Sequence, residues 1–181
     1  MKITTPVWAI CILLLLHSCG NPSPRQYFEQ AALNCNLLYG FAGYELDRDL
    51  ATTQEKLANE KTMKMMPVTR AEVVKEKLAR VEKNYAKLKS LGTNAEADGM
   101  LKASTALYEF VIPVYKNEYT QLADLYDKKA ATEKIDAAVT NIKNKYAARF
   151  EEMYNAVMKT GTAYAEKNGI PVKQVNPAPS N

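Results

Sequence analysis

The stretch from Tyr108 to Tyr126, YEFVIPVYKNEYTQLADLY, decides the fold class. Large apolar side chains recur along it at intervals of four and three residues, namely Tyr108, Ile112, Tyr115, Tyr119, Leu122 and Tyr126. This spacing keeps one stripe on one face of an α-helix, so it predicts an amphipathic helix packed against neighbours. Pro113 lies inside the stretch, and we expect a kink near Glu109, whose carbonyl loses its usual partner.

Stripes with the same period occur on both sides of this stretch. They start at Phe28, Val74 and Ile135. The four stripes predict helices over about residues 24–62, 70–91, 94–129 and 133–168. No strand-like alternation of useful length competes with them. Because short connections make successive helices antiparallel, we predict an all-α, up-down-up-down four-helix bundle over residues 24–170, followed by a loose tail over 171–181.

Local signals support the ends of these helices. Capping-box patterns start at Ser23, Thr69 and Thr93, and Gly92 and Gly169 suit the position just after a helix. The connection between the last two helices carries neither Gly nor Pro. We place it at residues 128–131, with Thr132 as the N-cap of the last helix. The alternative is one continuous helix over residues 94–168, which would form an elongated dimer.

The N-terminus reads as a targeting segment. Lys2 precedes an apolar run over residues 7–16, which is too short for an ordinary membrane span. The next residues, Leu16-His17-Ser18-Cys19, resemble the lipobox of bacterial lipoproteins. The resemblance implies a signal peptide over residues 1–18, cleavage before Cys19, acylation of the Cys19 thiol, and a lipidated tether over residues 19–25. The alternatives are an ordinary signal peptide cut near Ser18 or a retained signal anchor.

Composition after such a cleavage excludes several kinds of chemistry. The only histidine, His17, and the only tryptophan, Trp8, would leave with the signal peptide, and Cys35 would remain as the single unmodified thiol. Ser-His-Asp and Cys-His catalysis and His-based zinc sites are therefore excluded. The net charge of the full chain, +4, is too balanced for a dedicated nucleic-acid binder. We predict a non-catalytic protein without a cofactor.

Two groups of residues could bind a ligand. Tyrosines on the third stripe could line a pocket for an apolar or glycan ligand, although they also suit a helix core: Tyr108, Tyr115, Tyr119 and Tyr126. The sulfurs of Met63, Met65 and Met66 could bind Cu(I), because thioethers are soft ligands, although Met also fills gaps at helix ends.

A second resemblance covers residues 99–170. The runs LYEFVIPVYKNEY and TAYAEKNGI are similar to those of a group of uncharacterised small helical lipoproteins of Gram-negative bacteria. In lipoproteins of such envelopes, Gly20 rather than Asp after the lipidated Cys implies the outer membrane, and the absence of an acidic cluster there implies a periplasmic face.

These observations predict a lipid-anchored envelope protein. Its partners would be the membrane, through Cys19, and another envelope component that it binds or scaffolds. The sequence leaves its oligomeric state open. The two alternatives are a carrier with a Tyr-lined pocket between helices and a Cu(I) handler with a Met cluster.

Overall fold

The computed structural model describes residues 22–59 and 61–172, and this part of the chain is mostly helical. The α-helices are α1 (Pro24–Ala31), α2 (Tyr44–Ala51), α3 (Arg70–Ser90), α4 (Asp98–Val114), α5 (Thr120–Asp127) and α6 (Thr132–Lys167). A 3-10 helix, η1 (Leu33–Leu38), follows α1, and a π-helical turn, η2 (Tyr115–Tyr119), joins α4 to α5. The strands β1 (Gln54–Asn59) and β2 (Lys64–Val68) form one antiparallel hairpin. The predicted all-α class is thus observed, with this small sheet added.

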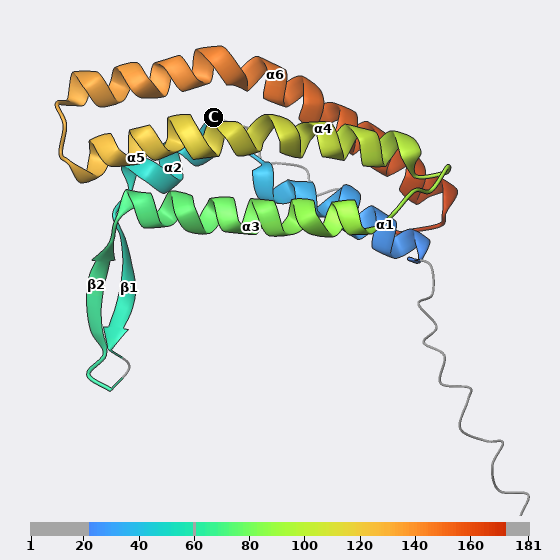
Figure 1. The fold of residues 1–181 in the computed structure, drawn as a ribbon, viewed down its shortest axis with the longest axis horizontal. Coiled ribbons are helices and arrows are strands. Elements are labelled where there is room, and N and C mark those ends of the chain that lie inside the picture. The colour runs from blue at the N-terminus through green and yellow to red at the C-terminus, as the bar shows by residue number, and fades with distance from the viewer. Residues whose placement is uncertain (1–21, 60, 173–181) are drawn as a thin grey trace, which may run out of the picture.

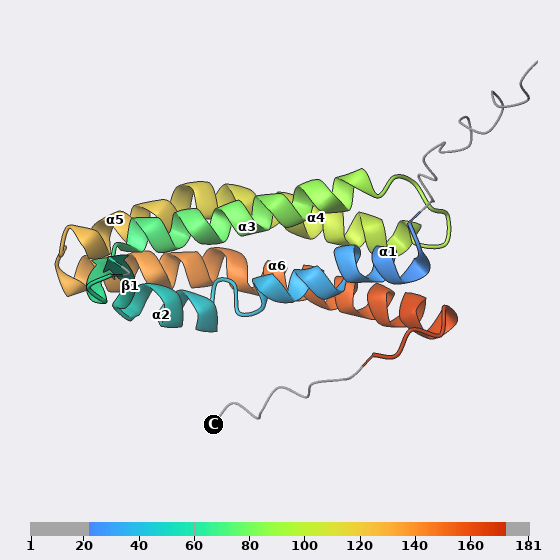
Figure 2. The ribbon, with the colours of Figure 1, turned by 90° about the horizontal axis from the view of Figure 1, so that it is seen from below.

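Three long rods define the shape of the molecule. Helix α3, the continuous rod of α4, η2 and α5, and helix α6 run side by side (Figure 1). The shorter segments α1, η1 and α2 lie along α3, and α1 and η1 also contact α6 (Figure 2). The hairpin projects away from the end of the rods where α2 and α3 meet it (Figure 1). No helix of the described residues is both long and apolar enough to cross a membrane.

The prediction of one helix over residues 24–62 is wrong, because the chain turns between Leu38 and Tyr44. Gly40 and Ala42 adopt positive φ angles of 82° and 56°, and the Gly40 carbonyl accepts hydrogen bonds from the N–H groups of Gly43 and Glu45. The apolar stripe survives this break, since most of its members are buried: Phe28, Ala32, Cys35, Ala42, Leu46 and Leu50. Tyr39 of the same stripe is 54% exposed.

The hairpin is a second correction, since we expected helix up to residue 62 and a loop after it. Helix α2 ends at Ala51, and the chain then extends through two β-branched threonines, Thr52 and Thr53. Strand β1 pairs with β2 from Gln54 opposite Val68 onward. In a hairpin of two strands both strands are edges, and Pro67 can therefore lie in β2.

The ends of α3 lie within one residue of the predicted span. The Thr69 hydroxyl accepts from the Glu72 N–H, and the Glu72 carboxylate accepts from the Thr69 N–H, which completes the capping box. Helix α4 begins at Asp98 rather than at residue 94. Asn94 Oδ1 accepts from the N–H groups of Glu96 and Ala97, so an Asn-based turn replaces the expected box at Thr93.

Pro113 lies inside α4, and the next irregularity of the helix is the π turn η2, which begins two residues after the proline. Pro113 lacks an N–H, and the helix widens into a π turn at Tyr115–Tyr119 before it resumes as α5. The Thr120 hydroxyl donates to the Tyr115 carbonyl at 3.0 Å and satisfies part of this turn.

A tight turn separates α5 from α6, so one continuous helix over residues 94–168 is excluded. Lys129 adopts a φ of 52°, and the Ala130 N–H donates to the Leu125 carbonyl at 2.9 Å. Helix α6 begins at Thr132 itself, and Ala131 rather than Thr132 occupies the N-cap position. A lysine in the left-handed region thus makes a turn that no Gly or Pro marks in the sequence.

Candidate functional site

The tyrosines proposed to bind a ligand are part of the hydrophobic core. Tyr108, Tyr115 and Tyr119 are at most 2% exposed. Tyr126 is half-buried, and the Arg70 guanidinium lies 5.9 Å from the centre of its ring. Phe41 from the turn before α2 stacks on Tyr119 and meets Tyr115 edge-on, which fills the space around these rings.

A buried polar cluster lies beside these rings, which we call the Glu45 cluster. The Tyr115 hydroxyl donates to Glu45 Oε2 at 3.0 Å, and Lys77 Nζ forms an ion pair with Glu45 Oε1. Glu45 is only 2% exposed and the Lys77 side chain 12%. Nearby, the Tyr119 hydroxyl accepts a 2.8 Å hydrogen bond from the Ala42 N–H. The cluster therefore joins α2, α3 and η2 in the interior.

Burial governs the ionisation of the Glu45 cluster. Removal from water raises the pKa of Glu45, and the hydrogen bond and charge of Lys77 offset only part of this effect. Burial and the neighbouring Glu45 carboxylate raise the pKa of Tyr115 well above its ordinary value. A perturbed carboxyl beside a lysine can mark catalysis, but here Glu45 is closed to substrates. We therefore interpret the cluster as structural.

Sequence reasoning missed Glu45. It directly precedes Leu46 of the first apolar stripe, so the available signal was a carboxylate next to a core position. Its partners lie at distant positions in the sequence, and no spacing rule connects them.

Cys35 is a buried thiol in a tightly packed region. Its sulfur donates to the Ala31 carbonyl at 3.3 Å, and burial raises its pKa to about 11. The Tyr108 hydroxyl, beside Cys35 and Asn84, is buried without a direct hydrogen bond. Because a reactive cysteine needs access and a lowered pKa, Cys35 is a core residue rather than a nucleophile.

The three methionines of the proposed copper site lie on the hairpin and are exposed by 71% (Met63), 48% (Met65) and 41% (Met66). Met65 and Met66 are successive residues of β2, opposite Leu57 and Lys56, so their side chains point to opposite faces of the hairpin. The strand therefore does not bring these two sulfurs together. Within residues 22–59 and 61–172, no group of three His, Cys, Asp or Glu residues could hold a metal.

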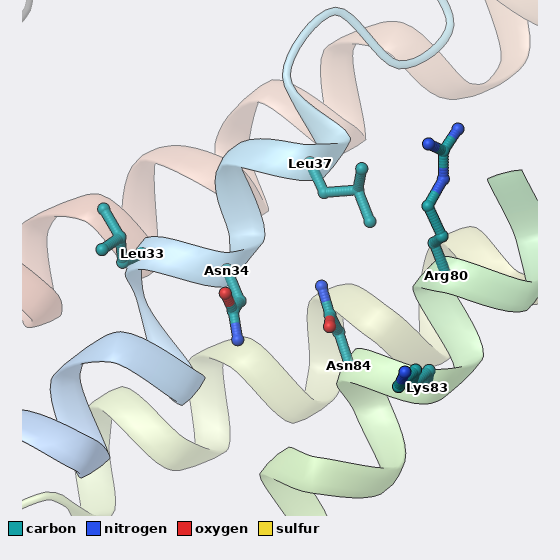
Figure 3. Close-up of a pocket in the computed structure, with 6 residues that line it drawn as sticks. All are labelled: Leu33, Asn34, Leu37, Arg80, Lys83 and Asn84. Carbon is teal, nitrogen blue, oxygen red and sulfur yellow. The ribbon is translucent and has the colours of Figure 1, made fainter.

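Two hollows open on the surface beside α3. The first, the α3–η1 hollow, has a volume of about 370 Å³ (Figure 3). Its lining residues come from η1 and α3 and are Leu33, Asn34, Leu37, Arg80, Lys83 and Asn84. The second, the hairpin hollow, has a volume of about 470 Å³ and reaches the base of the hairpin at Lys56 and Val68. The hollows meet at Leu37 and Arg80, and none of the four proposed tyrosines lines either one.

Three cations in the hairpin hollow are paired within the protein. Arg48 contacts Asp49 at 2.5 Å, Lys56 contacts Glu72 at 2.6 Å, and Lys77 pairs with Glu45. Glu55, Glu76 and Arg80 also line this hollow, and within residues 22–59 and 61–172 none of the three forms an ion pair. The predicted signal peptide, Cys19 and Gly20 lie outside the described residues. Comparisons with known proteins add no relative, since no family model, curated protein or solved structure matches this chain.

Proposed function

We propose that this protein is a non-catalytic, lipid-anchored protein of the cell envelope that binds another envelope protein through its hairpin. The proposal joins the lipobox pattern at residues 16–19 with the exposed hairpin of residues 54–68. The signal peptide over residues 1–18 is removed, and acyl chains on Cys19 then anchor the protein in the membrane. The anchored protein lies on the periplasmic side of the outer membrane.

The helices serve this function as a rigid platform. We propose that they form an antiparallel up-down-up-down four-helix bundle in which α1, η1 and α2 together take the place of the first helix. The side-by-side rods of α3, α4 to α5, and α6 support this description (Figure 1).

The hairpin is the observation that carries the binding proposal. It projects from the end of the rods (Figure 1), and three of the seven large hydrophobic side chains found exposed in the described residues are its Met63, Met65 and Met66. Flexible, polarizable methionine side chains suit protein contacts, and the edges of a two-stranded hairpin can pair with a strand of a partner. Acyl anchoring would raise the effective concentration of the hairpin near membrane partners.

Substitution of the hairpin methionines tests the binding proposal. The protein is purified from solubilised membranes, and the triple variant Met63→Ser/Met65→Ser/Met66→Ser is compared with wild type. We expect one envelope protein to co-purify with wild type in stoichiometric amounts. The triple variant should no longer recover this protein. A matched control, Ala137→Ser/Thr140→Ala/Asn144→Ser on α6, should retain it, and equal recovery with both variants would refute the role of the hairpin.

The anchor has its own test. Cys19→Ala should move the protein from the membrane fraction to the soluble fraction, because the only acylation site of the lipobox is lost. Unchanged membrane retention would contradict lipidation at Cys19 and leave the hairpin proposal standing.

A carrier of a small apolar or glycan ligand is the second candidate for this protein. It would need a Tyr-lined pocket, whereas the tyrosines pack in the core and the two hollows are lined by other residues. The geometry therefore favours the binding role. Cu(I) handling has less support, since Met65 and Met66 diverge on β2.

A further inference from the structure

The α3–η1 hollow carries positive charge that nothing in the described protein neutralises. Arg80 and Lys83 stand on its α3 side (Figure 3), and within residues 22–59 and 61–172 neither forms an ion pair or a side-chain hydrogen bond. In the hairpin hollow, by contrast, Arg48, Lys56 and Lys77 contact carboxylates, and the only lining cation without an ion pair in the described residues is Arg80, which lines both hollows. The hollow therefore favours an anionic ligand.

The positive charge extends along the same helix. Helix α3 contains seven basic and three acidic residues, a surplus of four that equals the net charge of the whole chain. Two of the acidic residues, Glu72 and Glu82, pair with lysines outside α3. Lys87 follows Lys83 by four residues and is also exposed, so the flank beside the hollow is basic over more than one turn.

The opposite side of the hollow, formed by η1, carries two leucines beside Asn34. Leu33, which is 50% exposed, and the partly buried Leu37 line the hollow from η1, and Leu37 points toward α3 (Figure 3). Asn84 points from α3 toward η1 between the two sides. A small inorganic anion would contact the cations and leave the leucines uncovered. A ligand with an anionic group joined to an apolar part would match both sides.

We propose that the α3–η1 hollow binds the headgroup of an anionic phospholipid. The phosphate lies between Arg80 and Lys83, and the glycerol and first acyl carbons lie on Leu33 and Leu37. Arg offers a fork of donors that suits phosphate, and Lys adds a point charge. The basic flank that continues to Lys87 matches a membrane surface, where many headgroups are present, better than a single soluble molecule. This proposal does not depend on the hairpin or on Cys19.

Hydrogen exchange of the full chain tests the site directly. The chain is mixed with excess nanodiscs of phosphatidylcholine, with or without phosphatidylglycerol, and exchange is followed at the amides of η1 and α3. Phosphatidylglycerol should slow local exchange in η1 about tenfold when the headgroup concentration is about ten times the dissociation constant. Glycerol phosphate added to phosphatidylcholine discs should leave exchange unchanged, since it lacks the apolar part.

Matched variants locate the effect. Arg80→Gln/Lys83→Gln should abolish the response to phosphatidylglycerol, whereas Lys134→Gln/Lys159→Gln, which removes the same charge from exposed positions of α6, should retain it. Unchanged exchange in α6 shows that each variant is folded. The proposal is overturned if phosphatidylglycerol has no effect, if both double variants respond alike, or if glycerol phosphate protects η1 as strongly as the lipid does.

Discussion

The Tyr115 hydroxyl donates a 3.0 Å hydrogen bond to Glu45 Oε2 in the interior of the protein. Lys77 pairs with the other oxygen of the same carboxylate. One buried carboxylate thus connects the π turn η2, helix α2 and helix α3, which lie far apart in the sequence. Because an unpaired buried charge is costly, this cluster fixes how the N-terminal segment meets the long helices.

Tyr115→Phe should lower the free energy of unfolding by about 2 kcal/mol, since it leaves Glu45 Oε2 without its donor. Denaturant unfolding followed by circular dichroism measures the change. Tyr108→Phe is the matched control, because that hydroxyl is equally buried but makes no direct hydrogen bond. It should leave stability unchanged or raise it by about 1 kcal/mol. A larger loss at Tyr108 than at Tyr115 would contradict this assignment.

Lys77→Met should be strongly destabilising, by about 3 kcal/mol, because it leaves the Glu45 carboxylate buried without its cation. The double variant Glu45→Met/Lys77→Met should recover most of that loss, since two apolar side chains replace the ion pair. Unfolding curves of wild type, both single variants and the double variant measure the coupling. Additive losses would show that the two side chains do not form a pair.

The pH dependence of stability should report Glu45. Burial raises the pKa of Glu45 above its ordinary value of 4.5, so the folded state holds the proton more tightly than the unfolded chain does. Its contribution to stability is therefore full below 4.5 and falls as the pH rises through the folded pKa. The free energy of unfolding of wild type minus that of Glu45→Gln should decrease over this range. A difference that grows with pH would mean that the pKa of Glu45 is lowered.

Gly161 of α6 marks a close helix contact. A Cβ at this position would lie 2.6 Å from the Ala32 Cβ, so Gly161→Ala should cost about 2 kcal/mol by forcing α6 away from the N-terminal segment. Gly99→Ala is the control, because nothing lies within 4 Å of its added Cβ. It should stabilise α4 by about 0.5 kcal/mol. Thermal melts of both variants show whether each substitution lowers or raises the melting temperature. Equal changes in the two variants would contradict a close contact at Gly161.

The stripes of apolar residues predicted which positions are buried better than they predicted where the helices begin and end. Positions such as Cys35, Leu46 and Leu50 are buried as their period indicates, although the predicted helix is broken between them. The break depends on Gly40 and Ala42 in left-handed conformations, and residue type signals only the glycine. The turn at Lys129 lies within the predicted connection at residues 128–131, even though no Gly or Pro marks it.

The hairpin and the candidate sites could not be predicted from the sequence, because they depend on contacts between residues that lie far apart along the chain. Residues 54–59 carry no strict alternation, and their pairing with β2 is a nonlocal property. The predicted tyrosine site consists of core side chains, since one stripe cannot show whether it faces a pocket or a packed neighbour. The Glu45 cluster and the α3–η1 hollow each combine residues from separate elements, which only the folded chain brings together.

Site-specific photo-crosslinking from Met65 in intact cells tests the central claim most directly. We predict a discrete adduct with one envelope protein from Met65, none from Ala137 on the exposed face of α6, and a much weaker Met65 adduct when Cys19→Ala removes the anchor. Similar adducts from Met65 and Ala137, or no adduct from Met65 in the anchored protein, would contradict binding through the hairpin.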